Sequence, residues 1–502
     1  MKFFDRFHEN DIALNDAHRS ITAAQAEARV HALFSYFRSD LALLPGETIA
    51  LLLSNRLEVF ELLLAGIAAG LHIVPLNHQL KREELFYILK DSNARILVHD
   101  GVSEDPFDFG GRSLSIERIE EGIEGHLGTR LEDVGDLPPG GPTIYTSGTT
   151  GRPKAVVRSR PPRLVEAVRA FRKTGALFGL DGSGAHLVAG PLYHAAPLLF
   201  ALYDLLNGAR VIIHPRFQPR ALLDSIRDEQ IAHLHLVPTH FIRLLRLPEQ
   251  ERTAFDPSPI RLALHGAAPI APSVKRAMIE WWGPKLREYW GATEGGIYTL
   301  IDAAEWLERE GSVGRPLPHF EIAAFDERGR RLPPHHIGTL YVRHRENPEP
   351  FVYRGDPGKT RDAYLGGGFF TAGDLGHLDE AGYVYLSARR SDLILSGGVN
   401  IYPKEIEAAA IDDEAVEDIY VFGEPDEEWG ERVVAAIAFR PGPMSGTVES
   451  AVEALRKRLA NRLAGYKLPR VVEVHRSLPR NEAGKIRKGD LGVETRITRI
   501  EF

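Results

Sequence analysis

The chain contains no cysteine among its 502 residues. This absence excludes disulfide bonds, thiolate nucleophiles, iron–sulfur clusters and cysteine-ligated zinc sites together. Long uncharged apolar runs are missing as well. The most apolar stretch, residues 49–76, is interrupted by Asn55, Arg56, Glu58 and Glu61. A membrane span needs about 20 mostly uncharged residues, so we expect a buried strand followed by an amphipathic helix here.

An excess of basic charge is also lacking. Lys and Arg number 61 against 69 Asp and Glu, which gives a formal net charge of −8, so nothing global favours nucleic acid as a partner. The first ten residues carry acids and bases and lack the apolar core of a signal peptide. We therefore expect a soluble, cytoplasmic protein with no integral membrane segment.

Strand-like and helix-like segments alternate along most of the chain, which is typical of a doubly wound α/β sheet. Short strands are expected at residues 47–53, 72–75 and 94–99, with helices at 57–70 and 82–92. Further strand-like runs lie at residues 186–189, 209–214, 231–237 and 260–264.

The pattern changes towards the C-terminus. Residues 321–343 alternate like a β-hairpin with a polar turn. Beyond residue 391 we expect a small α+β domain on the order of a hundred residues, a common domain size. Its expected elements are a helix at 401–411, strands at 419–422 and 433–439, a helix at 447–464 and a last strand at 471–474.

The strongest local signal is the string TSGTTGRPK at residues 146–154. Its glycines allow the backbone to wrap closely around an anion, and its hydroxyls and lysine supply donors for phosphate oxygens. It is not a Walker A loop, because Arg152 and Pro153 separate the last glycine from Lys154. A generic Gly/Thr string of this kind would more often be a surface turn.

The whole string resembles the phosphate loop of the adenylate-forming superfamily, which comprises acyl-CoA synthetases, peptide-synthetase adenylation domains and luciferases. Five further strings resemble motifs of that family, in the family's order and across nearly the whole chain. They are HGAAP at 265–269, YWGATE at 289–294, AGD at 372–374, RRSDLILSGGVNIYPKEIE at 389–407 and PRNEAGK at 479–485.

The resemblance sets the expected domain boundaries. It implies an N-terminal domain over residues 1–389, with doubly wound sheets and a β-rich subdomain at about 320–389, and a small, mobile α+β C-terminal domain over 390–502. The hinge between them departs from the family's usual sequence. The expected pivot is either Ser391 or Asp392.

The resemblance further implies ATP, Mg²⁺ and coenzyme A as cofactors. Asp374 and Arg389 are implied to bind the ribose, and Trp290, where the family usually has tyrosine, to stack on adenine. The expected nucleotide-binding residues are Thr146, Ser147, Gly148, Thr149, Thr150, Gly151, Lys154, Gly266, Ala267, Ala268, Tyr289, Trp290, Gly291, Asp374 and Arg389.

The implied reaction joins a carboxylate to the α-phosphorus of ATP. Because these anions repel, the site must supply positive charge and hold both reactants in line. The resemblance implies Lys485 as a mobile ammonium, Thr293 as a donor to a phosphate oxygen, and Glu294 with Thr146 as ligands of Mg²⁺. His194 is implied to gate the acyl pocket. From local sequence alone, Lys485 would be a solvated lysine and Glu294 an exposed glutamate.

Several small residues follow the pocket motifs and indicate room for a bulky or long acyl group. They are Ala195, Ala196, Gly295 and Gly296, with Val237, Thr239, Phe241 and Tyr289 as expected walls. Since the chain has no cysteine, the thiol acceptor must be external, and Gly397 and Gly398 are expected to approach the pantetheine of coenzyme A. Residues 305–316 weakly resemble fatty-, bile- or steroid-acid ligases.

These features predict an ATP-dependent acid–CoA ligase that makes acyl-AMP and pyrophosphate, then acyl-CoA and AMP, from a medium- or long-chain or bulky cyclic acid. The expected partners are the small acid and coenzyme A, with a homodimer as one option. Two alternatives stay open: an enzyme that loads a free-standing carrier protein, and a non-catalytic nucleotide-binding relative. His233, His235 and His240 also mimic a metal-site spacing, for which packed side chains are the alternative.

Overall fold

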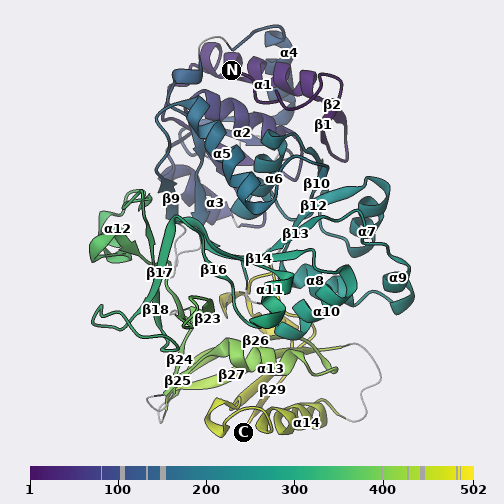
Figure 1. Ribbon diagram of the computed structural model, residues 1–502, viewed down its shortest axis with the longest axis vertical. Helices are drawn as coiled ribbons and strands as arrows, with labels where there is room; N and C mark the ends of the chain where they lie inside the picture. Colours follow the sequence, from purple (N-terminus) through teal and green to yellow (C-terminus); the bar gives the residue numbers. More distant parts are fainter. Residues whose placement is uncertain are drawn as a thin grey trace.

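The computed structural model describes residues 1–80, 82–101, 108–131, 134–146, 154–268, 270–389, 392–396, 399–426, 429–440, 447–481, 484–486 and 488–502. Helices and strands are interleaved along the chain, as the sequence predicts for an α/β protein (Figure 1). Within these ranges, no helix combines the length and apolar character needed to cross a membrane.

Two largely parallel sheets form the N-terminal part. The first is wholly parallel, with the order β6 (Arg112–Ser115), β5 (Ala94–His99), β3 (Thr48–Leu52), β4 (His72–Pro75) and β7 (Gly141–Pro142). The second runs in the order β16 (Arg315–Pro316), β15 (Gly296–Asp302), β14 (Leu286–Ala292), β13 (Leu262–His265), β12 (Ile231–Leu236), β10 (Ala185–Val188), β11 (Arg210–Ile213), β1 (Ile12–Asn15) and β2 (Ser20–Thr22). From β14 to β1 its strands are parallel.

Helices pack against these sheets and supply the apolar faces of the core. They are α1 (Ala23–Ser39), α2 (Glu58–Ala68), α3 (Arg82–Asp91), α4 (Ile116–His126), α5 (Leu164–Phe178), α6 (Ala195–Asn207), α7 (Pro219–Asp228), α8 (Pro238–Leu245), α9 (Glu249–Ala254), α10 (Pro272–Trp282) and α11 (Ala303–Glu308).

The helix α2 differs from its expected amphipathic character, because every one of its residues is buried. Its two carboxylates lie inside the protein beside arginines. Arg19 Nη2 is 2.8 Å from Glu58 Oε1, and Arg29 Nε is 2.6 Å from Glu61 Oε1. A buried charge is tolerated when it is paired and hydrogen-bonded. These ion pairs allow a helix that carries charges to be surrounded completely.

A β-rich region joins distant parts of the sequence. The predicted hairpin is present as β17 (Phe320–Phe325) and β18 (Gly338–His344), which pair in antiparallel fashion. The sheet continues through β20 (Tyr364–Leu365), β21 (Phe369–Phe370), β22 (Asp374–Leu378) and β23 (Val384–Arg389). A smaller antiparallel sheet pairs β19 (Phe351–Tyr353) with β9 (Lys154–Arg158), and β9 with β8 (Ile144–Thr146). The short helix α12 (Pro357–Ala363) follows β19.

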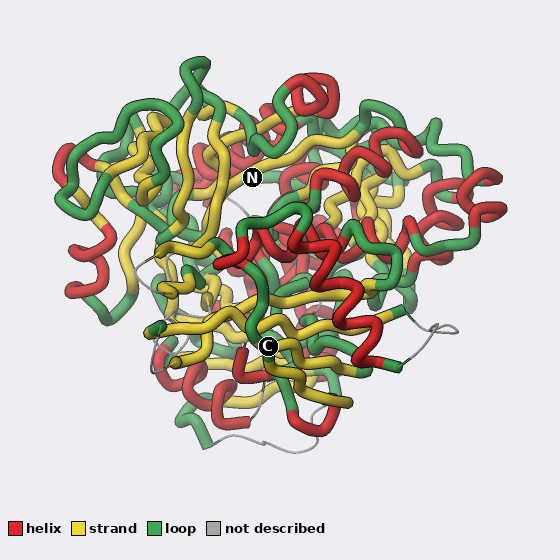
Figure 2. The backbone as a smooth tube through the Cα atoms, turned by 90° about the horizontal axis from the view of Figure 1, so that it is seen from below, coloured by secondary structure: helices red, strands yellow, loops and turns green. Residues whose placement is uncertain are grey.

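The C-terminal part forms one further sheet with two helices, α13 (Pro403–Ile411) and α14 (Val448–Ala460). Figure 2 shows its strands side by side near the C-terminus. The strands are β24 (Ile394–Ser396), β25 (Val399–Ile401), β26 (Val416–Asp426), β27 (Gly430–Phe439), β28 (Val471–His475) and β29 (Arg496–Glu501).

Two sequence expectations are wrong here. Residue 401 belongs to β25, so the helix begins only at Pro403, a residue favoured in the first turn. The strand at residues 471–474 is not the last one, because β29 pairs with β28 in antiparallel fashion. β29 lies at the sheet edge and is half-buried or exposed throughout, so it lacks the apolar run by which the central strands are recognised.

A buried carboxylate ties α6 to two strands of the large sheet. Asp204 Oδ2 accepts hydrogen bonds from His186 Nδ1 on β10 at 3.0 Å and from His233 Nδ1 on β12 at 2.8 Å. Its Oδ1 accepts from the backbone N–H of Gly182 at 3.0 Å. Burial raises the pKa of Asp204, but the two histidine hydrogen bonds outweigh burial and lower the pKa to about 2.

We expect Asp204→Asn to lower the free energy of unfolding at pH 7 by about 2–3 kcal/mol, because a pKa lowered by about two units corresponds to that energy. Since the folded-state pKa lies below the unfolded value, the contribution is present above about pH 4 and is lost as the pH falls towards 2. Urea unfolding of both proteins between pH 3 and 7 measures this. Asp224→Asn, which removes an exposed ion pair with Arg227, should cost less than about 1 kcal/mol. A difference independent of pH would contradict the assignment.

Candidate active site

The hairpin of β14 and β15 holds the centre of the candidate site. Trp290 lies on β14, and Thr293 and Glu294 lie in the turn before β15. The hairpin is irregular beside Gly291. A Cβ at Gly291 would lie 2.3 Å from the carbonyl oxygen of Gly296, closer than real contacts allow. Glycine is therefore required where the two strands turn.

The residues expected on the ribose side meet across two strands. Asp374 begins β22 and Arg389 ends β23, and they are direct partners in the antiparallel register. The indole Nε1 of Trp290 donates a hydrogen bond to Asp374 Oδ2 at 3.0 Å, and both side chains are buried. Trp290 thus supplies a donor that fixes the carboxylate.

Glu294 is a buried carboxylate, 9% exposed, that accepts a hydrogen bond from Tyr353 Oη at 2.8 Å. Within the described ranges it forms no ion pair. A buried anion with only a neutral donor has room for a cation, and its hard carboxylate oxygen suits Mg²⁺. Glu294 therefore fits the predicted metal-ligand role. The side chain of Thr146, the other expected ligand, lies outside the described part of the structure.

A cationic cluster lies at the end of the β8–β9 hairpin. Lys154, the first residue of β9, forms an ion pair with Asp356. That pair lowers the pKa of Asp356, and Asp356 Oδ1 also accepts from the backbone N–H of Lys359 at 2.8 Å. Burial, and then Lys154, lower the pKa of Lys359, while Glu294 and Asp356 oppose the shift. The predicted phosphate-loop residues Ser147, Gly148, Thr149, Thr150 and Gly151 lie outside the described residues.

Sequence reasoning missed three of these residues, Tyr353, Asp356 and Lys359. The pair Asp356-Pro357 is a helix-start signal, and Asp356 indeed caps α12. That signal predicts a turn but no partner, because Lys154 lies 202 positions earlier in the chain.

The motif on the expected adenine side has an unusual backbone. Ala267 has φ of 64°, in the left-handed region that residues other than glycine rarely adopt. Next to it, a Cβ at Gly266 would lie 2.6 Å from the carbonyl oxygen of Tyr289. The close approach of these two chains leaves a slim backbone surface, as expected for Gly266, Ala267 and Ala268.

The side chain of Tyr289 is directed towards the expected acyl side. Its hydroxyl lies 3.0 Å from His235 Nε2, and its ring packs edge-on against Phe200 at a centroid distance of 5.2 Å. Burial, and then neighbouring histidines, lower the pKa of His235 to about 3. A neutral imidazole and two aromatic rings therefore form one buried cluster, called the aromatic surface below.

The glycines expected to leave room for a long acyl group are closely packed. A Cβ at Gly295 would lie 2.6 Å from ring atoms of Phe370 and Tyr298, and one at Gly296 would lie 3.0 Å from Arg158. These side chains occupy the space, so the two glycines serve close packing. That part of the sequence expectation is corrected.

The histidines with metal-like spacing are engaged separately. His233 contacts Asp204, His235 contacts Tyr289, and His240 stacks on Phe217 at a centroid distance of 3.9 Å. Among the described side chains, no group of three or more His, Asp or Glu is placed to hold a metal ion. These three residues are therefore packed histidines.

The loop that carries Lys485 sits against the N-terminal part. Gly484 has φ of 75°, and a Cβ on it would lie 2.8 Å from Thr239 at the start of α8. His194 lies just before α6. Burial, and then the positive charge of Lys485, lower the pKa of His194 to about 4. The loop of Lys485 therefore lies against Thr239, and the charge of Lys485 acts on His194. Gly397, Gly398 and Ser391 lie outside the described residues.

Comparisons with known proteins agree with this geometry. The chain is 32% identical over 493 residues to a feruloyl-CoA synthase of an Amycolatopsis species, covering 97% of this chain and 96% of the relative. It is 31% identical to the 2-succinylbenzoate–CoA ligase of Geobacillus kaustophilus, covering 96% and 94% of the two chains.

A solved structure has the same fold along nearly the whole chain. It is the o-succinylbenzoate CoA synthetase of Bacillus subtilis in complex with its acyl-adenylate intermediate, with a TM-score of 0.82, 26% identity and 97% of each chain covered. Residues 4–348 match the profile of the AMP-binding enzyme family, and residues 405–485 match the AMP-binding enzyme C-terminal domain. The chain belongs to the AMP-binding enzyme family, as the motifs predict.

Proposed function

We propose that this chain is an ATP-dependent acid–CoA ligase that forms acyl-AMP and pyrophosphate, and then acyl-CoA and AMP, from an aromatic carboxylic acid. The observation that carries the proposal is the position of Lys485. Its loop lies against Thr239 of α8, and its charge lowers the pKa of His194, the residue before α6. In this proposal, the ammonium of Lys485 acts where a carboxylate and a phosphate have to meet. The curated relatives named above are CoA ligases, in agreement with this reading.

In this proposal, the ammonium of Lys485 offsets the repulsion between the acid and the α-phosphate. When ATP binds, Lys154 leaves its ion pair with Asp356 and binds the phosphates instead. Thr293 donates a hydrogen bond to a phosphate oxygen. Asp374, held by Trp290, accepts hydrogen bonds from the ribose hydroxyls, and Arg389 donates to the ribose. Gly397 and Gly398 stay predicted contacts of coenzyme A.

Glu294 is the proposed ligand of Mg²⁺, with Thr146. A bound Mg²⁺ would neutralise phosphate charge. Tyr353 orients the Glu294 carboxylate through its hydrogen bond. Lys359 lies close enough for Glu294 to affect its pKa, so it would add positive charge on the same side.

The proposed acid is aromatic because Tyr289, Phe200 and His235 form an aromatic surface near His194. Planar rings pack favourably on such surfaces. The relatives named above act on feruloyl and succinylbenzoyl groups. The predicted link to fatty acid and lipid metabolism has no such support. A cytoplasmic location, a homodimer, the domain boundary at 389/390 and a pivot at Ser391 or Asp392 stay predictions.

Lys485→Ala tests the proposed chemistry. We expect it to lower the rate of acyl-AMP formation by at least about a hundredfold, because the cation acts on the charge of that transition state. Thioester formation from supplied acyl-AMP should change less than about threefold. The two half-reactions are followed by pyrophosphate release and by CoA consumption. Lys467→Ala, which removes a lysine paired with Glu405 elsewhere in the same part, is the control. An equal loss in both half-reactions would contradict the role proposed for Lys485.

The same assays separate the alternatives. Acid-dependent exchange of labelled pyrophosphate into ATP without CoA consumption would favour loading of a carrier protein. No exchange with a broad panel of acids would favour a non-catalytic relative. We expect both exchange and CoA consumption.

Tyr289→Ala tests the aromatic surface. In the wild-type enzyme, kcat/KM for cinnamic and phenylacetic acids should exceed that for decanoic acid by at least about tenfold, the discrimination that hydrophobic contacts supply. The variant should lose most of this preference, because the ring that packs on Phe200 is gone. Tyr466→Ala changes an exposed tyrosine and should leave the preference intact. A wild-type preference for decanoic acid would refute the substrate class.

Trp290→Phe tests the hold on Asp374. The variant keeps an aromatic face but loses the indole donor, so we expect KM for ATP to rise by at least about tenfold, the effect of one hydrogen bond to a charged group. The KM for the acid should change little. Trp281→Phe removes a comparable indole hydrogen bond, to the carbonyl oxygen of Arg252, and serves as the matched control. An unchanged KM for ATP would rule out this positioning role.

A further inference from the structure

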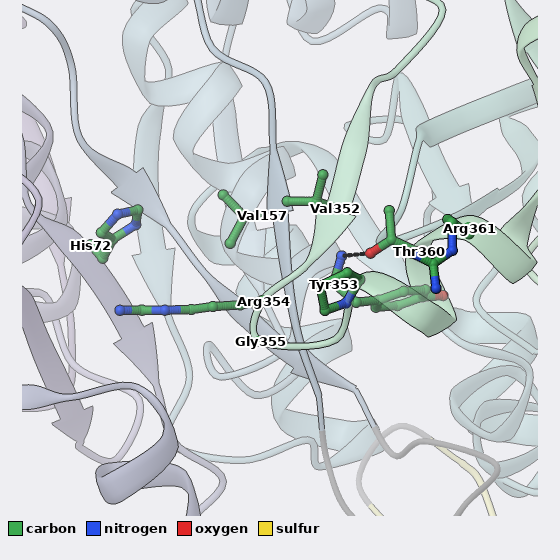
Figure 3. A pocket seen from close by; sticks show the side chains of 9 residues that line it. His72, Val157, Val352, Tyr353, Arg354, Gly355, Thr360 and Arg361 are labelled. Carbon is green, nitrogen blue, oxygen red and sulfur yellow. Dashed lines mark hydrogen bonds between the residues drawn. The ribbon is translucent and has the colours of Figure 1, made fainter.

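A cavity of about 640 Å³ lies beside the β8–β9 hairpin. His72 of β4 and Val157 of β9 form one side of it, and Val352 of β19, Arg354 and Arg361 form the other. Figure 3 shows the guanidinium of Arg354 extended across the cavity towards His72. Its size is within the range of small-molecule sites.

The cavity is cationic. Within the described ranges, neither Arg354 nor Arg361 forms an ion pair, and the Nη1 atom of Arg354 is buried without a hydrogen-bond partner. Arg160 lies behind His72, with Nη2 at 3.5 Å from His72 Nδ1 and at 3.4 Å from the carbonyl oxygen of Gly141. Arg160 also has no ion pair with a described residue. Burial lowers its pKa to about 10, which leaves it charged at neutral pH.

The positive charge of these arginines affects the pKa of His72. Burial, and then Arg160 and Arg354, lower its pKa to about 4. The carboxylate nearest to Arg354 along the chain, Asp356, is engaged by Lys154. Arg354 and Arg160 are half-buried and Arg361 is exposed, and their positive charge has no carboxylate in an ion pair among the described side chains. Charged groups that are withdrawn from water are usually paired in proteins.

The position of the cavity connects it with the phosphate hairpin. The backbone N–H of Arg354 donates to the carbonyl oxygen of Ala155 at 3.1 Å. Ala155 follows Lys154, whose partner Asp356 lies two residues beyond Arg354. The cationic cavity and the Lys154–Asp356 pair therefore share the same two chain segments.

We propose that this cavity is a phosphate-binding site additional to the predicted phosphate loop, formed by Arg354 and Arg361, with Arg160 behind His72. Guanidinium groups bind phosphate oxygens through paired, charge-assisted hydrogen bonds. Two phosphate sources exist if the proposed function holds: the pyrophosphate released in acyl-AMP formation and the 3′-phosphate of coenzyme A. Either phosphate would supply the negative charge that these arginines do not receive from a described residue.

Titration calorimetry without turnover tests the site. The enzyme is first saturated with α,β-methylene-ATP, which occupies the main nucleotide site, and inorganic pyrophosphate is then added. We expect one equivalent to bind. Arg354→Gln should weaken this binding by at least about tenfold, the loss of hydrogen bonds to a charged group, whereas Arg354→Lys should retain it within about threefold. Arg220→Gln, which removes an exposed charge on α7, should have no effect.

Competition identifies the source. Displacement of pyrophosphate by coenzyme A but not by 3′-dephospho-coenzyme A assigns the site to the 3′-phosphate, and displacement by neither assigns it to pyrophosphate. Thermal unfolding of the Arg354 variants checks that they are folded. Absence of pyrophosphate binding to the nucleotide-saturated enzyme, or equal binding by wild type and Arg354→Gln, overturns the proposal. Because no catalysis is required, this outcome is independent of the result for Lys485→Ala.

Discussion

The position that Lys485 takes in this structure depends on the imidazole of His194 remaining uncharged. The two side chains are close enough for Lys485 to lower the pKa of His194, and burial lowers it further, to about 4. A protonated imidazole would repel the ammonium in a site of low dielectric constant. At neutral pH His194 is therefore uncharged, and the proposed encounter of carboxylate and phosphate relies on the ammonium of Lys485.

The same rule of compensation holds through the N-terminal sheets. Arg19 and Arg29 accompany the carboxylates of α2, and Lys275 Nζ lies 2.5 Å from Glu288 Oε2 at the start of β14. Paired charges of this kind fix neighbouring elements, because removing one partner leaves the other buried and uncompensated. Arg354 and Arg160 depart from this rule within the described residues, and that departure distinguishes their cavity from the paired charges of the core.

Local pattern was enough to predict the parallel strands. The strands at His72–Pro75 and Ala94–His99 have the predicted bounds, because buried parallel strands are short, nearly continuous apolar runs. β29 could not be found this way, since its edge position leaves it half-exposed. The full burial of α2 was also missed, because its acidic residues suggested a solvent-facing side and their arginine partners lie in other elements.

The candidate site was predictable only where residues that act together are adjacent in sequence. The resemblance supplied Trp290, Glu294, Asp374 and Lys485, but not the contacts between motifs. Tyr353 reaches Glu294 across 59 positions, and the indole of Trp290 reaches Asp374 across 84. Such pairs depend on the register of strands, which no local spacing encodes.

Polar contacts join the C-terminal part to the helices that cover the large sheet. Arg246 Nη1 lies 3.2 Å from Glu417 Oε1, and Ser273 Oγ donates to Asp412 Oδ1 at 2.6 Å, both near solvent. Water replaces such partners at little cost in free energy, unlike the contacts of an apolar core. Breaking these two contacts would therefore cost little free energy, which is what the predicted mobility of the C-terminal domain requires.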